Sequence, residues 1–219
     1  MKPFEEVVEL RLHNIEGFTD WLWPREDGVE GDGGAWLGPM NDWNDSHSTK
    51  YFEYVTEYGT VIQAGGNCGM YPRLFSKYFK EVYSFEPDPL NFYCAVNNCK
   101  NLPIKIFPCA LGSSHRNASL IKAPPSNIGM HKILDEGYGK IPILKIDDFK
   151  YHHPVGLIQL DVEGFEWNVL NGATETIEKY SPVIICEKPS RDCIKFLNNL
   201  GYTERSISMM DHIFVKEVV

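Results

Sequence analysis

From residue 48 onward, short runs of consecutive apolar residues alternate with longer amphipathic stretches. Runs such as TVIQA and PVIICE carry apolar side chains on both faces, which is typical of strands buried within a parallel sheet. Strands that alternate with helices in this way predict an α/β fold, with a mainly parallel sheet covered by helices on both faces. The strands are expected at 60–64, 82–87, 104–111, 156–164, 182–188, 202–209 and 212–219, the last two forming an antiparallel edge hairpin. The helices are expected at 48–58, 72–80, 89–101, 166–180 and 191–202.

The first 47 residues differ in composition from the rest of the chain. They hold four of the five tryptophans among glycines and acids, and the Gly/Asp stretch at 27–34 predicts a loop. We expect residues 1–47 to form an extension or lid, and residues 48–219 to form the main domain. The alternatives for this extension are stacking on a flat acceptor and packing against the sheet edge or a second subunit. The tryptophans concerned are Trp21, Trp23, Trp36 and Trp43.

Charge and cysteine content narrow the class of protein. The formal net charge is −9 and the basic residues are scattered, whereas nucleic-acid binders concentrate basic residues on one face. We therefore expect a small-molecule or glycan partner in preference to a nucleic acid. The six cysteines form no CxxC pair, which indicates reduced thiols and no zinc site. The apolar runs are too short for a membrane span and the acidic N-terminus lacks a signal-peptide core, so we expect a cytoplasmic protein.

The stretch VIQAGGNCGMY at 61–71 places three glycines directly after the first regular strand. Ligands of open parallel sheets bind beyond the carboxyl ends of the strands, and glycine lets them approach the backbone. Glu86 ends the second strand about twenty residues later, where an acid accepts hydrogen bonds from ribose hydroxyls. The stretch does not match the dinucleotide-binding pattern G-x-G-x-x-G, because Asn67 and Met70 stand where that pattern requires glycine. The pattern favours an adenosine ligand without a diphosphate, such as S-adenosylmethionine; the alternative is a turn that needs glycine only for packing.

Six segments, taken in order, resemble the FkbM-type methyltransferases, a branch of the class I S-adenosylmethionine-dependent enzymes. They are VIQAGGNCGMY, SFEPDP, PCALG, IDDF, LDVEGFE with VLNGA, and PVIICE, and together they cover roughly residues 50 to 190. The resemblance implies a Rossmann-like, mostly parallel seven-stranded sheet. It also implies S-adenosylmethionine as the cofactor and transfer of its methyl group to a hydroxyl of a carbohydrate-like or secondary-metabolite acceptor. The first 45 or so residues lie outside it.

The resemblance also implies roles for individual residues. The floor under the cofactor would be shaped by Gly65, Gly66, Asn67 and Gly69. Glu86 would hold the ribose, with Pro87 and Asp88 framing the turn, and the adenine would be flanked by Cys109, Ala110 and Leu111. Asp161 would face the methionine end of the cofactor and the transferring methyl group.

One position departs from the family pattern. Gln63 stands where the family usually carries an aspartate that meets the cofactor's ammonium group. An amide oxygen can accept the same hydrogen bond but brings no charge. We therefore expect weaker cofactor binding than in relatives with the acid, and tighter binding in a Gln63→Asp variant.

A methyl acceptor that is a hydroxyl needs a nearby base to take its proton. Asp161 and Glu163 follow the same buried strand and are the first candidates, and His131, in the loop NIGMHKI, is the third. An alternative role for Glu163 is to cap the next helix. Asp147, Asp148 and Glu187 could join Asp161 around a hard cation, but the family pattern demands no metal and none is expected.

Two other functions compete with a small-molecule methyltransferase. The first is a nucleic-acid-modifying methyltransferase, against which the net charge argues. The second is a cofactor-binding protein without catalysis, which the loss of the acid at Gln63 suggests. Release of S-adenosylhomocysteine in the presence of an acceptor separates an enzyme from such a binding protein.

Overall fold

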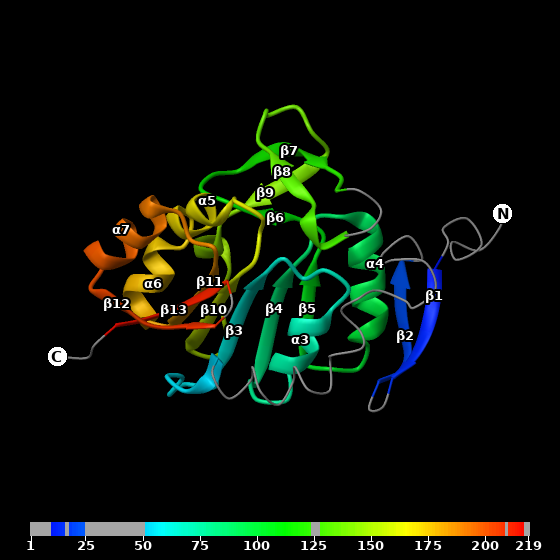
Figure 1. Cartoon of the computed structure of the whole chain (residues 1–219), viewed down its shortest axis with the longest axis horizontal. Coiled ribbons are helices and arrows are strands. Elements are labelled where there is room, and N and C mark those ends of the chain that lie inside the picture. The colour runs from blue at the N-terminus through cyan, green and yellow to red at the C-terminus, as the bar shows by residue number, and fades with distance from the viewer. Residues whose placement is uncertain (1–9, 16–17, 25–50, 124–127, 209, 217–219) are drawn as a thin grey trace.

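The computed structural model describes residues 10–15, 18–24, 51–123, 128–208 and 210–216. Its centre is a seven-stranded sheet in which only β13 runs against the other strands, pairing antiparallel with β11 and β12. This confirms the expected mostly parallel sheet with an antiparallel edge hairpin (Figure 1). In spatial order the strands are β12 (Tyr202–Ser208), β13 (Asp211–Lys216), β11 (Val183–Glu187), β10 (Val155–Leu160), β3 (Thr60–Ala64), β4 (Glu81–Phe85) and β5 (Ile104–Phe107).

Neighbouring residues of the central strands belong to different hydrophobic clusters, because successive side chains of a strand point to opposite faces. On β10, Ile158 packs in a cluster with residues of α5 (Glu166–Asn171), α6 (Thr174–Tyr180) and α7 (Arg191–Asn199). Leu157 packs in a second cluster with Tyr51 and with Phe75 of α3 (Met70–Phe75). Both faces of the sheet are therefore covered, as the continuous apolar strands predicted.

The register of the parallel strands sets which polar residues become neighbours. Gln63 of β3 is paired with Gln159 of β10, and Leu160 of β10 is paired with Cys186 of β11. The residues that follow, Asp161 and Glu187, consequently leave adjacent strands at the same edge. This is the carboxyl edge at which the sequence placed a ligand.

A second sheet lies beyond the carboxyl ends of β3, β4 and β5 (Figure 1). The sequence did not predict it: residues 104–111 were read as one strand, whereas the chain leaves the main sheet after β5 and joins this sheet at β6. Its four strands are β6 (Ala110–Leu111), β9 (Ile141–Leu144), β7 (Arg116–Ile121) and β8 (Lys132–Leu134), with the short 3-10 turns η1 (Ile128–Met130) and η2 (Ile146–Asp148) nearby in the chain.

Every predicted helix is shorter than expected or divided; the one expected at 72–80, for example, is α3, which ends at Phe75. The helix expected at 166–180 is broken into α5 and α6 at Gly172, where a Cβ would lie 1.9 Å from the carbonyl oxygen of Gly112. The helix expected at 48–58 continues only to residue 52 within the described residues.

Among the described helices, none has the length and apolar character needed to cross a bilayer. All six cysteines are buried free thiols, as expected.

The described part of the N-terminal extension is a hairpin of β1 (Leu10–Ile15) and β2 (Phe18–Pro24), which packs beside α4 (Pro89–Asn98) (Figure 1). Trp21 and Trp23 are each only 1% exposed, in a cluster with Cys68, Cys94 and Ile128. Stacking of these two tryptophans on an acceptor is therefore ruled out in this arrangement, because their rings are covered by protein. Trp36 and Trp43 lie outside the described residues.

Candidate active site

The glycine turn after β3 is held against the ends of three strands. Gly65 and Gly66 both donate their backbone N–H to the carbonyl of Phe85, at 3.1 and 3.0 Å. A Cβ on Gly65 would lie 1.8 Å from the carbonyl oxygen of Asp161, and Gly69 has a φ of 95°. These two glycines thus have a structural requirement: one allows a close backbone approach and the other a left-handed conformation.

Glu86 links β4 to the glycine turn. Its Oε2 accepts the backbone N–H of Asn67 at 2.6 Å, and its Oε1 accepts that of Asp88 at 2.8 Å. Burial raises the pKa of this carboxyl to about 8, although the two backbone hydrogen bonds act in the opposite direction. Each carboxylate oxygen can accept more than one hydrogen bond, so Glu86 retains capacity for ribose hydroxyls.

Gln63 is fully buried and both ends of its amide have protein partners. Its Nε2 donates to the carbonyl of Gly65 at 2.7 Å, and its Oε1 accepts the hydroxyl of Ser84 at 2.6 Å. The side chain therefore fixes the start of the glycine turn. Direct binding of the cofactor's ammonium by Gln63 stays a prediction, but these local bonds explain why an amide with a donor and an acceptor suits this position.

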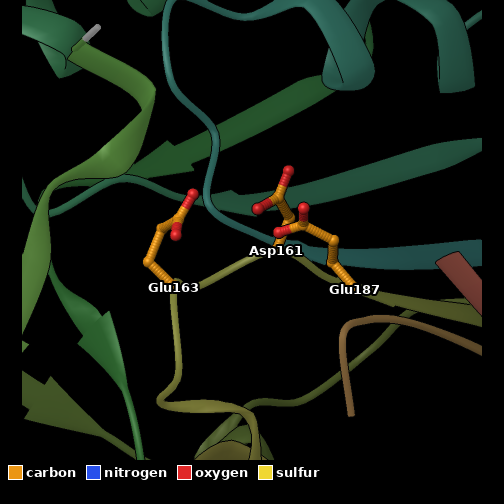
Figure 2. A group of neighbouring side chains, drawn as sticks. All are labelled: Asp161, Glu163 and Glu187. Atoms are coloured by element: carbon orange, nitrogen blue, oxygen red, sulfur yellow. The ribbon is translucent and has the colours of Figure 1, made fainter. Parts of the chain in front are cut away.

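Three carboxylates converge at the ends of β10 and β11. Asp161 and Glu187 lie side by side, and Glu163 faces them from the following loop (Figure 2). Oxygen atoms of the three residues lie within 4.8 Å of one another. Glu163 reaches this position with a φ of 54°, next to Gly164 with a φ of 98°. The expected pair, Asp161 and Glu163, is thus brought together, and Glu187 joins it.

Crowding of like charges changes the protonation of this carboxylate cluster (Asp161, Glu163 and Glu187). Burial, the charge of Glu187 and a hydrogen bond between the two carboxyl groups raise the pKa of Asp161 well above its usual value. Burial and Glu187 likewise raise the pKa of Glu163. The Asp161–Glu187 pair is therefore suited to hold a proton between its two carboxyl groups.

A tyrosine extends the site on the side of β13. The hydroxyl of Tyr51 donates to Asp211, whose charge contributes to the raised pKa of Asp161. Tyr71, in α3, lies with its hydroxyl 3.1 Å from that of Tyr51. Burial and Asp211 raise the pKa of Tyr51, so its hydroxyl keeps the proton that it donates.

The carboxylate cluster offers the oxygen ligands that Mg²⁺ and Ca²⁺ prefer. Such clusters also occur without an ion, so the geometry alone defines no metal centre. Asp147 and Asp148 do not join it, contrary to the alternative considered from sequence. Asp147 accepts the backbone N–H groups of Glu175 and Thr176 at the start of α6, and Asp148 pairs with His115.

His131 lies outside the carboxylate cluster. Its Nδ1 accepts the backbone N–H of Ala123 at 2.9 Å, and its Nε2 is 3.8 Å from Asp88 Oδ2. Asp88 is 1% exposed and its Oδ1 caps α4 by accepting from the N–H groups of Leu90 and Asn91. The structure thus places His131 near the Glu86 end of the site, and its catalytic role stays a prediction.

The segment expected to flank the adenine ring is buried. Cys109, Ala110 and Leu111 are 3%, 6% and 1% exposed and belong to the larger hydrophobic cluster. Burial raises the pKa of Cys109 to about 12, so this thiol is neutral. Pro87, between Glu86 and Asp88, is half-buried. The roles of these four residues at the adenine stay predictions.

Sequence reasoning considered Glu187 only as a possible cation ligand beside Asp161, and it missed Asp211 and Tyr51 as site residues. The signal for Glu187 was an acid at the end of the next apolar strand, PVIICE. Adjacent parallel strands end at the same edge, so Asp161 and Glu187 could have been paired once these strands were assumed to be neighbours. Asp211 and Tyr51 are 160 positions apart, and no local pattern joins them.

The strand order, the glycine turn and the acid at the end of β4 together define a class I methyltransferase fold. The chain belongs to the Methyltransferase FkbM domain family, whose sequence profile matches residues 67–204. The family resemblance found in the sequence is thereby confirmed. The matched region includes the carboxylate cluster and most of the glycine turn, but it does not include the N-terminal hairpin.

Individual relatives are more distant. The hexuronic acid methyltransferase AglP of Haloferax volcanii is 28% identical over 138 residues, which cover 61% of this chain and 57% of that protein. Among solved structures, a methyltransferase FkbM of Methylobacillus flagellatus KT aligns over 82% of this chain and 53% of its own, with 17% identity and a TM-score of 0.49. A tRNA (uracil-54, C5)-methyltransferase of Pyrococcus abyssi, in complex with S-adenosyl-L-homocysteine, covers 94% of this chain and 44% of its own, with 9% identity and a TM-score of 0.49.

Proposed function

We propose that this protein transfers the methyl group of S-adenosylmethionine to a hydroxyl of a carbohydrate-like or secondary-metabolite acceptor. The observation that carries the proposal is the placement of two different acidic sites at one edge of the sheet. Glu86 is bonded to the glycine turn, and the carboxylate cluster meets the same turn through the contact of Asp161 with Gly65. A ligand with a ribose at one end and positive charges at the other can bind both acidic sites at once.

The residues fit this cofactor chemically. When bound, it supplies an electrophilic methyl group on a positively charged sulfur. Glu86 accepts from ribose hydroxyls, and Gly65, Gly66, Asn67 and Gly69 keep the backbone close to the ligand. Burial, and then the repulsion of neighbouring carboxylates, raises the pKa of Asp161 and of Glu163. A cation beside them relieves this repulsion, so the acidic end of the site favours a positive ligand.

The chain's own part in the reaction is to orient the acceptor and to take up its proton. The ionised carboxylate of the Asp161–Glu187 pair receives the hydroxyl proton at a carboxylate oxygen, while the other carboxyl group stabilises it through their shared hydrogen bond. General base catalysis of this kind increases the reaction rate by about 10²- to 10⁴-fold. Positioning of the two reactants supplies the remaining rate enhancement.

The acceptor class rests on the relative that acts on hexuronic acid and on two nearby cations. Lys188 Nζ lies 2.9 Å from Glu187 Oε1, and the charges of Lys188 and Lys132 both act to lower the pKa of Glu163. These lysines can pair with an acid group on a sugar. A sugar acid or a related hydroxylated acceptor therefore fits better than a nucleic acid, which the net charge of −9 disfavours.

The test is to incubate the purified protein with methyl-labelled S-adenosylmethionine and matched pairs of neutral sugars and uronic acids. We expect release of S-adenosylhomocysteine and a labelled product that resists mild alkali, as a methyl ether does. A labelled product that mild alkali cleaves would indicate a methyl ester, which needs no base and would contradict the role given to Asp161. Binding of the cofactor with no turnover across the panel, or turnover only with RNA, would favour one of the two alternative functions.

A further inference from the structure

The glycine turn is supported from outside the family-matched region, by the N-terminal hairpin. Family similarity begins at residue 67, whereas β1 and β2 end at residue 24. The hairpin packs beside α4, and its Trp21 and Trp23 share a hydrophobic cluster with Cys68 of the glycine turn. A segment outside the matched region thus touches the part of the fold that is expected to hold the cofactor.

The connection runs through one buried side chain, Asn98, at the end of α4. Its Oδ1 accepts the backbone N–H of Leu22 at 2.7 Å, and its Nδ2 donates to the Leu22 carbonyl at 2.8 Å. The second hydrogen of Nδ2 goes to the carbonyl of Cys68, also at 2.8 Å. The amide therefore pairs with the outer edge of β2 as a neighbouring strand would, and it reaches the glycine turn at the same time.

The glycine turn needs a hydrogen-bond donor for the Cys68 carbonyl. Cys68 is fully buried, and a buried carbonyl without a hydrogen bond is costly. Its neighbours Asn67 and Gly69 have φ angles of 44° and 95°, so the backbone on both sides is in the left-handed region. Asn67 is also the residue whose N–H is accepted by Glu86. Movement of Cys68 would therefore displace the N–H that orients Glu86.

Arg73 adds a second link between the same parts. It lies on α3, which directly follows the turn, and its Nη1 donates to the carbonyl of Asn98 at 2.6 Å. Its guanidinium carbon lies 5.6 Å from the ring centroid of Trp21, within cation–π range. Arg73 of α3 therefore contacts both the end of α4 and the hairpin.

We propose that the β1–β2 hairpin sets the conformation of the glycine turn through Asn98, and so determines the affinity for the adenosyl cofactor. Asn98 is a positioning residue: it holds the Cys68 carbonyl and touches no reacting atom. The described hairpin thus acts as a support beneath the cofactor site, and a lid role for the rest of residues 1–47 stays a prediction. This inference rests on the proposed function, because it assumes that the glycine turn holds the cofactor.

The test compares Asn98→Ala with Asn97→Ala in the full chain. Asn97 is the adjacent residue on α4, it is exposed, and its amide donates only to the Tyr93 carbonyl of the same helix. Calorimetry with S-adenosylhomocysteine, at a temperature where both variants are folded, gives the dissociation constants. We expect an increase of about tenfold for Asn98→Ala and a change below about twofold for Asn97→Ala. An Asn98 with a purely structural role would lower the melting temperature and leave the dissociation constant of the folded protein unchanged, which would overturn the inference.

Hydrogen exchange of the wild-type protein needs no variant and covers the case in which Asn98→Ala fails to fold. Coupling between two sites is reciprocal. Saturation with S-adenosylhomocysteine is therefore expected to slow amide exchange both in residues 66–69 and in residues 20–24 of the hairpin. Slowing in the turn alone would contradict the inference while leaving the proposed function intact.

A wrong cofactor assignment can be distinguished from a wrong inference about Asn98. If the wild-type protein binds neither S-adenosylmethionine nor S-adenosylhomocysteine, the cofactor assignment is wrong. The support of the turn is then judged without ligand, from amide exchange in residues 66–69. Exchange about tenfold faster in Asn98→Ala than in Asn97→Ala would keep the structural part of the inference, and equal exchange would overturn it.

Discussion

The two acidic regions of the site differ in how their charges are accommodated. At the end of β4, each oxygen of Glu86 accepts a backbone N–H, so the carboxyl group is already held in one orientation, whichever its protonation state. At the ends of β10 and β11, Asp161 meets Glu163 and Glu187, and three like charges lie together. This geometry suits Glu86 to orienting a ligand, and it suits the carboxylate cluster to pairing with a cation or exchanging a proton.

The largest expected effect is loss of turnover in Asp161→Asn. The amide retains the shape of the side chain but cannot share a proton with Glu187, so the pair loses its part in taking up the acceptor's proton and the rate should fall by about 10²- to 10⁴-fold. The fold should remain intact, as judged by circular dichroism. Wild-type turnover with a working acceptor would show that the carboxylate cluster has no part in proton transfer, and the contrast between the two regions would fail.

The same variant has a predicted effect on stability. The raised pKa of Asp161 means that the folded state binds its proton more tightly than the unfolded state does, so stability is lost as pH rises above the usual aspartate range. Because asparagine does not titrate, Asp161→Asn removes this pH-dependent loss of stability. Its melting temperature should exceed that of the wild type at pH 8 and converge with it near pH 4. A lower melting temperature at pH 8 would contradict the raised pKa.

Glu86→Ala is expected to weaken cofactor binding more than it affects catalysis of the bound complex. Each hydrogen bond to a charged group contributes about 1.5–3 kcal/mol, reduced by competition with water, so we expect a dissociation constant higher by about tenfold to a hundredfold. Calorimetry measures it, and Glu81→Ala, at the opposite end of the same strand, is the control. Equal effects of the two substitutions would mean that Glu86 supports β4 and does not contact the cofactor.

Gln63→Asp tests the residue of β3 that fixes the start of the glycine turn, which lies between Glu86 and the carboxylate cluster. The family pattern led us to expect tighter binding from the added charge, but the local hydrogen bonds reverse this expectation. An aspartate can still accept from Ser84, but it cannot donate to the Gly65 carbonyl, and it puts a charge into a fully buried site. We expect a loss of about 1–3 kcal/mol in the free energy of unfolding, without tighter binding. Unchanged stability in urea denaturation, together with tighter binding, would restore the family interpretation.

The smallest expected effect is a proton release on binding. The pKa of Glu86 is about 8 in the cofactor-free chain, so the carboxyl is largely protonated at pH 7. Hydroxyl donors from a ribose favour the ionised form and lower this pKa, so binding at pH 7 should release a fraction of a proton. Calorimetry in two buffers of different ionisation enthalpy measures the release. It should disappear in Glu86→Ala; proton uptake in the wild type would have the wrong sign.

The parts of the fold that the sequence predicted are those in which local pattern and packing agree. TVIQA and GLIQLDVEG are apolar on both faces, so their place in a covered sheet follows from the side chains alone. The sheet of β6 to β9 was missed because its strands, such as RNASLI and KIL, are short and only partly apolar. Glu163 was found from its motif, whereas Glu187 joins it through the pairing of β10 with β11, which is a property of the assembled sheet.

The central claim is that the edge formed by the glycine turn, Glu86 and the carboxylate cluster binds an adenosyl cofactor with a positively charged sulfur. Parallel calorimetric titrations with S-adenosylmethionine, S-adenosylhomocysteine and NAD test it directly. We predict saturable one-to-one binding of the first two, no binding of NAD, and tighter binding of S-adenosylmethionine because its sulfur carries the charge that the carboxylate cluster favours. Binding of NAD alone, or equal affinity for the charged and neutral sulfur compounds, would contradict the account.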